Sequence, residues 1–163
     1  MLQGRAEDLP FADEFDVVGA FDVLEHIEDD HGALRALARA ARPGGGVVVA
    51  VPQHPWLWAA ADVASGHHRR YRRRELVSAA AAAGLDVVRV TSFVSLLLPL
   101  LLLSRLRHRR PDPSYDVVRE IDIGRAANGV LDAVMRVEAA LLRRGVALPA
   151  GGSLLLVARR PVG

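Results

Sequence analysis

The chain has 163 residues, 51% of them hydrophobic, which suits one domain with a sizeable core. It has no cysteine, so a disulfide framework and a thiolate metal site are excluded, and the composition fits a reducing cytoplasm. Residues 1–30 carry ten acids and one arginine, whereas residues 31–163 carry nine acids and twenty arginines, a basic part that favours phosphate, nucleic acid or an anionic membrane surface.

The first part of the chain alternates strand and helix patterns. The N-terminus has no basic n-region and no apolar h-region, so we predict no signal peptide and a cytoplasmic protein. The near-continuous apolar run "FDVVGAF", residues 15–21, predicts a strand covered on both faces. The further predicted elements are a helix over 29–42 that Pro43 stops, a buried strand over 46–52, an irregular segment, a helix over 72–83 that ends at Gly84, and a strand over 86–93. This alternation predicts an α/β fold with a parallel sheet and helices on its faces.

The tail departs from this alternation. We predict a single partial domain over residues 1–163, with an apolar and then basic insertion over 93–115. The apolar run 93–103 is too short for a membrane-spanning helix, which needs ~20 apolar residues. It is either a core segment or substrate lid, or a segment that dips into lipid, because Arg105, Arg107, Arg109 and Arg110 follow it. An amphipathic helix over 128–144 and a last strand within 151–160 complete the prediction.

Polar residues follow the first two predicted strands. They are Asp22, Glu25 and His26 after the first strand, and Gln53 and His54 after the second. In an open α/β sheet, ligands bind at the carboxyl ends of the strands, so we predict that these five residues line a ligand crevice. The acids at 28–30 are instead typical of a solvated helix start, which the helix dipole favours.

Three stretches of the sequence carry a family resemblance. "AEDLPF", "FDVVGAFDVLEHI" and "RPGGGVVVAVP" lie within residues 4–52, and "GHHRRYRRREL" with "AAGLDVVRV" continues the match. In order and spacing they resemble the second half of a class I S-adenosylmethionine-dependent methyltransferase, closest to the quinone-biosynthesis group. The resemblance implies a Rossmann-like fold, a mostly parallel sheet with a final antiparallel strand at "GGSLLLVARR", and S-adenosylmethionine as the cofactor.

The resemblance also implies a cofactor site. Its residues are Ala6, Glu7, Asp8 and Leu9 in a loop that holds the adenine, and Asp22 and Val23 beside the methionine part of the cofactor. Ala6 offers a backbone N–H to the adenine ring. Arg5 stands where the family often has an acid, so Glu7 or Asp8 would accept from the adenine amino group.

The same resemblance places a small-molecule or lipid-linked acceptor opposite the cofactor. The residues implied to face it are Glu25, Gln53, His67, Arg69, Arg70 and Tyr71. The five arginines of segment 69–74 form either a phosphate or carboxylate clamp or a solvated helix start. A single tyrosine among them is too little aromatic surface for base stacking, so nucleic acid is the less favoured partner.

Histidine is the residue type that could remove a proton from an oxygen acceptor. We predict His26 and His54 as catalytic, ahead of His67, with the alternative that each only lines the crevice. We predict no metal site, because the side chains of His67 and the adjacent His68 would diverge and the chain has no H-x-x-x-H motif.

The family's glycine-rich loop has no counterpart in the chain. Gly44, Gly45 and Gly46 precede a predicted strand, whereas a nucleotide-binding loop follows a strand and opens a helix. We therefore expect a truncated, C-terminal half of the fold, with self-association through the exposed edge of strand 15–21. The alternatives are a non-catalytic fragment that completes another chain, a peripheral membrane-binding module, and, least favoured, a nucleotide-dependent oxidoreductase.

Overall fold

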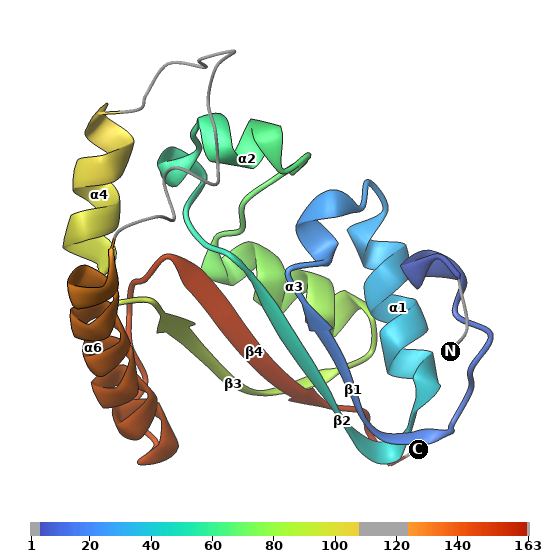
Figure 1. The fold of residues 1–163 in the computed structure, drawn as a ribbon. Coiled ribbons are helices and arrows are strands. Elements are labelled where there is room, and N and C mark those ends of the chain that lie inside the picture. The colour runs from blue at the N-terminus through green and yellow to red at the C-terminus, as the bar shows by residue number, and fades with distance from the viewer. Residues whose placement is uncertain (1–3, 108–123, 163) are drawn as a thin grey trace.

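A four-stranded sheet forms the centre of the computed structural model, which describes residues 4–107 and 124–162 (Figure 1). The strands are β1 (Phe15–Phe21), β2 (Ala41–Pro52), β3 (Asp86–Phe93) and β4 (Ser153–Arg159), in the spatial order β1-β2-β4-β3. β1 pairs with β2 in parallel, and β4 lies antiparallel between β2 and β3. β1, β2 and β3 therefore run in one direction, and their carboxyl ends lie at one end of the sheet. The prediction of a mostly parallel sheet with a final antiparallel strand is confirmed.

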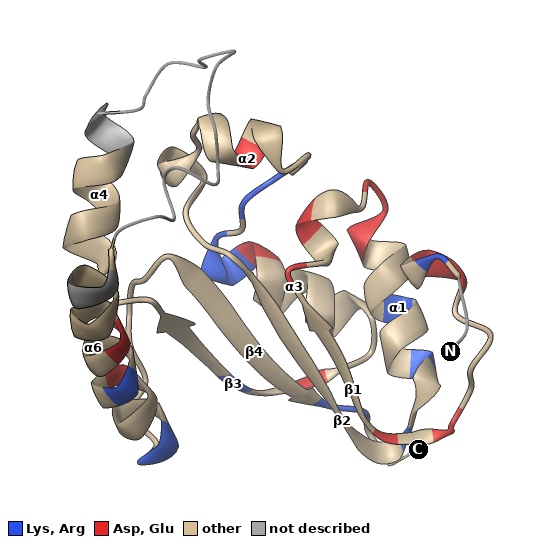
Figure 2. Ribbon diagram, in the orientation of Figure 1, with Lys and Arg blue, Asp and Glu red and all other residues tan. Residues whose placement is uncertain are grey.

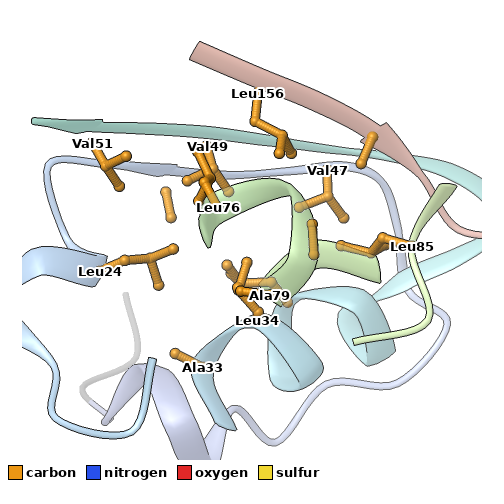
Figure 3. Packing of buried hydrophobic residues seen from close by; sticks show 14 of the residues in the cluster. Leu24, Ala33, Leu34, Val47, Val49, Val51, Leu76, Ala79, Leu85 and Leu156 are labelled. Atoms are coloured by element: carbon orange, nitrogen blue, oxygen red, sulfur yellow. The ribbon is translucent and has the colours of Figure 1, made fainter. Parts of the chain in front are cut away.

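Helices α1 (Asp30–Ala40) and α3 (Arg73–Ala82) cover one face of this sheet. Side chains from β2 and β4, including Val49 and Leu156, point toward Leu34 and Leu76 (Figure 3). Burial of such a side chain contributes about 1.5–3 kcal/mol. The apolar layer therefore fixes α1 and α3 against the strands, and with them the segments that enter these helices from the strand ends.

The remaining elements lie at the ends of the strands and beside β3. They are the 3-10 helices η1 (Ala6–Asp8), η2 (Leu24–His26) and η3 (Pro55–Leu57), and the helices α2 (Ala60–Ala64), α4 (Leu98–Arg107) and α6 (Arg125–Arg143). Glu138 on α6 accepts from the backbone N–H groups of Ser95 and Leu96, each at 2.8 Å. This contact holds the segment that leads from β3 into α4. Within the described residues, no helix has the length and hydropathy that a bilayer crossing requires.

Two sequence predictions are wrong in detail. β1 is covered on one face only: Val17 is 61% and Phe21 59% exposed, because no described helix lies over their side of the strand. The helix predicted over 29–42 ends at Ala40, and Arg42 lies in β2, where its guanidinium pairs with Asp16 of β1 at 2.5 Å. Strand pairing with β1 thus ends the helix earlier than its apolar pattern indicates. Residues 108–115 of the predicted insertion, with Arg109 and Arg110, lie outside the described residues.

Candidate functional site

A cavity of about 750 Å³ opens at the carboxyl end of β1. It is lined by Gly4, Arg5, Ala6, Glu7, Asp22, Val23, His26, Ile27, Glu28, Asp29 and His68. Its wall therefore joins the turn at η1 to the segment that follows β1. Four of the six predicted cofactor residues (Ala6, Glu7, Asp22 and Val23) meet here with the predicted catalytic His26. Asp8 and Leu9 belong to the same turn but do not line the cavity.

The lining of this cavity is acidic. It includes the carboxylates of Glu7, Asp22, Glu28 and Asp29 against the one guanidinium of Arg5. Figure 2 shows acidic residues gathered on η1 and on the segment between β1 and α1. Arg5 lies 2.8 Å from Glu7, and this hydrogen bond lowers the pKa of the Glu7 carboxyl. The other carboxylates leave the cavity suited to a cationic group.

The backbone is strained where each of the three parallel strands ends. Asp22, His54 and Val94 have φ angles of 51°, 63° and 56° and follow β1, β2 and β3. Residues other than glycine rarely adopt this left-handed region of φ, and a β-branched valine does so least of all. Such conformations cost about 1–3 kcal/mol each and gather at functional sites. Three of the four non-glycine residues with a positive φ angle in the described part of the chain thus lie at this end of the sheet, and Asp13, before β1, is the fourth.

Buried polar atoms without partners mark the same end. Among the described residues, neither carboxylate oxygen of Glu25 has a hydrogen-bond partner, nor do Gln53 Oε1 and His54 Nε2. Glu25 is fully buried, and burial raises the pKa of its carboxyl. Native proteins leave few buried polar atoms unpaired, and each such atom needs an explanation. All three side chains belong to residues that the strand-end argument placed in a ligand crevice.

The side chains of Arg69, Arg70 and Tyr71, which the sequence predicted to face an acceptor, contact other parts of the chain instead. Arg70 Nε lies 2.7 Å from Asp62 Oδ1, and both side chains are buried. Arg69 lies 3.0 Å from Asp30 Oδ2, and the Tyr71 hydroxyl donates to the same oxygen at 2.8 Å. Burial and this carboxylate raise the pKa of the Tyr71 phenol. Arg69 and Tyr71 therefore hold segment 67–71 against the start of α1, whereas Arg70 ties it to Asp62 on α2.

His67 completes a cluster that the sequence did not reveal. Its ring packs edge-on against His26, with centroids 4.7 Å apart, and its Nδ1 lies 3.0 Å from Asp62 Oδ1. One donor atom from each of Glu25, His26 and His67 lies within 4.8 Å of the other two. Asp62 was missed, although one signal was present: it is the single acid between Asp30 and Glu75, in a stretch rich in arginine.

Comparison with known proteins identifies the family. The model of a family described as a methyltransferase domain matches residues 3–90, more than half of the chain. The chain therefore belongs to this methyltransferase family.

Solved structures share the fold at low sequence identity. A chain of the complex between the Haloferax volcanii Trm112 methyltransferase activator and a protein assigned as a methyltransferase matches with a TM-score of 0.56 and 23% identity, over 98% of the present chain and 60% of its own. A Bacillus halodurans protein assigned as a methyltransferase matches with 0.59 and 14%, over 98% and 70%. Haemonchus contortus phosphoethanolamine N-methyltransferase 2, in complex with S-adenosyl-L-methionine, matches with 0.54 and 17%, over 96% and 36%. These matches show the Rossmann-like methyltransferase fold, and the chain spans 60% of the first of them.

The half-buried His54 generates a prediction about pH. Burial, and then the charge of Arg70, lower the pKa of His54 below its usual value near 6.5. The unfolded chain therefore takes up this proton first as the pH falls, so stability present above about pH 6.5 is lost below it. His54→Asn removes this titration and tolerates the positive φ angle.

We expect the free energy of unfolding of the unmodified chain to fall more than that of His54→Asn between about pH 7.5 and about pH 5. Urea unfolding at the two pH values measures both changes. An equal loss of unfolding free energy in the two proteins would contradict a lowered pKa of His54 in the folded chain.

Proposed function

We propose that the protein transfers a methyl group from S-adenosylmethionine to a small or lipid-linked acceptor, and that the cavity at the end of β1 holds the cofactor. The observation that carries the proposal is the meeting of η1 with Asp22 and Val23 on one cavity wall, in a chain of a methyltransferase family. One protein of the same fold is in complex with S-adenosyl-L-methionine. The acidic lining fits that molecule, since its sulfonium and amino groups are cationic.

The cofactor supplies an electrophilic methyl carbon, so the protein's work is binding and alignment for an in-line displacement. In this proposal Ala6 offers its backbone N–H to the adenine. Asp22, exposed on the cavity wall, stabilises the cationic methionine part. An oxygen acceptor must also lose a proton, and His26 on the wall and His54 at the end of β2 are the histidines proposed for that step.

A comparison of two ligands tests the role of Asp22. S-adenosylmethionine carries the sulfonium charge, whereas S-adenosylhomocysteine is an uncharged thioether of nearly the same shape. We expect Asp22→Asn to weaken S-adenosylmethionine binding about tenfold, or about 1.4 kcal/mol, and to weaken S-adenosylhomocysteine binding clearly less. Asparagine also tolerates the positive φ angle at this position.

Calorimetric titration of both ligands into the purified chain measures this difference. Asp86→Asn is the matched control, because Asp86 is exposed at the start of β3, at the other end of the sheet. Equal losses in the two variants, or no binding of either ligand by the folded chain, would contradict a cofactor site in this cavity.

A second candidate function is that of a non-catalytic fragment that completes another chain. The observation that favours it is the unpaired edge of β1. Among the described strands β1 pairs with β2 alone, and its side chains Val17 and Phe21 are exposed. An open, apolar strand edge is a template for pairing with another chain. β3, at the opposite edge, is protected by a shift in register and by Arg89, which donates to carbonyl oxygens of Leu142 and Val146.

This difference between the edges predicts self-association through β1. A charged side chain opposes edge pairing, so Val17→Arg should shift the chain toward monomer. Val88→Arg is the matched control, because Val88 is 67% exposed on β3. Sedimentation velocity over a concentration series measures the distribution, and monomer at all concentrations, or equal effects of the two variants, would contradict the prediction.

The lipid-linked acceptor and an anionic membrane surface rest on a different feature. Leu96, Leu100 and Leu103 are exposed on α4 and the segment before it. Exposed leucines with arginines nearby in the sequence favour binding to anionic vesicles. We expect Leu96→Ser, Leu100→Ser and Leu103→Ser together to lower co-sedimentation with phosphatidylserine-containing vesicles. Val130→Ser with Val137→Ser, on the exposed side of α6, is the control, and unchanged co-sedimentation would contradict the membrane role.

A further inference from the structure

We propose that Glu25, His26 and His67 form a binding site for a divalent transition metal ion, with Zn²⁺ the best fit, at the wall of the cavity. Their donor atoms already lie within 4.8 Å of one another. A tetrahedral ion with bonds of about 2 Å needs donors roughly 3.3 Å apart, so the three side chains would close by about 1.5 Å at most. Two imidazoles and one carboxylate are a donor set that Zn²⁺ takes in proteins, with one position left open.

The buried and unpaired carboxylate of Glu25 is the observation that points to a cation. Its side chain is 0% exposed, and within the described residues neither of its carboxylate oxygens has a hydrogen-bond partner. An isolated buried carboxylate is costly unless a partner compensates its charge. Its own backbone is fixed, because the Glu25 carbonyl oxygen accepts from the His68 N–H at 2.7 Å. A bound cation would supply the missing partner without moving the backbone.

His67 is oriented as a metal ligand would be. Its Nδ1 lies 3.0 Å from Asp62 Oδ1, so the proton sits on Nδ1 and the lone pair on Nε2 stays free. Asp62 is itself held by Arg70 and by the Ala59 N–H, at 2.7 and 2.8 Å. A carboxylate behind a ligating histidine is a common arrangement in metal sites, where it fixes the tautomer and the ring.

His26 gives the site access to the cavity. It lines the cavity wall and is exposed, whereas Glu25 is buried and His67 is nearly so. The open position of the ion would therefore face the space beside Asp22. A metal ion there would bind the oxygen of a hydroxyl acceptor and lower the pKa of that hydroxyl. His26, as a metal ligand, would then no longer serve as the base that removes the hydroxyl proton. This role of the ion rests on the proposed function, whereas metal binding itself does not.

Metal titration of the full chain tests the proposal without any activity assay. Co²⁺ replaces Zn²⁺ and reports its geometry in the visible spectrum. We expect one equivalent of Co²⁺ with the strong absorption of a tetrahedral site, displaced by Zn²⁺. Glu25→Gln, His26→Ala and His67→Ala should each weaken binding more than tenfold. His31→Ala is the control, because His31 is an exposed histidine on α1 and should bind Co²⁺ as the unmodified chain does.

A rise in the melting temperature with Zn²⁺ is the second measurement, expected for the unmodified chain and absent for His26→Ala. Because His26 is exposed, this variant should fold even if a change at the buried Glu25 prevents folding. No bound equivalent, an octahedral spectrum only, or equal affinities in His26→Ala and His31→Ala would overturn the proposal. Metal binding without any S-adenosylmethionine binding would uphold the site and remove its proposed role in methyl transfer.

Discussion

The parallel pairing of β1 with β2 is the constraint on which the rest of the structure depends. Its register sets Ala20 against Val49 and Phe21 against Ala50, and the Asp22 N–H continues the ladder to the Ala50 carbonyl oxygen at 3.0 Å. Both strands therefore deliver their polar successors at one end of the sheet. The cavity, three of the four positive φ angles of described non-glycine residues, and the unpaired buried atoms of Glu25, Gln53 and His54 lie there, because the carboxyl ends of parallel strands meet at one end of a sheet.

A second set of contacts turns this sheet end into a site. The segment after β2 returns past the start of α1, and Asp62 anchors it by accepting from Arg70 and by holding His67. Arg70 compensates the buried carboxylate, since its hydrogen bond and that of the Ala59 N–H outweigh burial and lower the pKa of Asp62. Arg70, one of the arginines that the sequence predicted as a ligand clamp, thus stabilises the fold. These contacts bring His67 to Glu25 and His26, which lie about forty residues earlier in the chain.

Sequence predicts the elements that local pattern determines. β1 and β3 have the predicted bounds, and for β1 the local reason is plain, because the charged Glu14 and Asp22 flank its apolar run. The end of α1 was misplaced, since Ala40 and Ala41 suit a helix equally and only pairing with β1 separates them. Of the five residues that the strand-end rule predicted to line a crevice, Asp22 and His26 line the cavity, whereas Glu25, Gln53 and His54 do not. Exposure of one face of β1, and the approach of His67 to Glu25, depend on contacts between distant segments that no local pattern encodes.

The central claim is that the turn at η1 and the segment after β1 form one cofactor cavity. Amide hydrogen exchange, measured with and without saturating S-adenosylmethionine, tests it most directly, because it locates the ligand on the chain. The account predicts slower exchange in residues 4–9 and 22–28 together, with β3 and β4 unchanged. Slower exchange confined to other segments, or none at any concentration of the ligand, would contradict it.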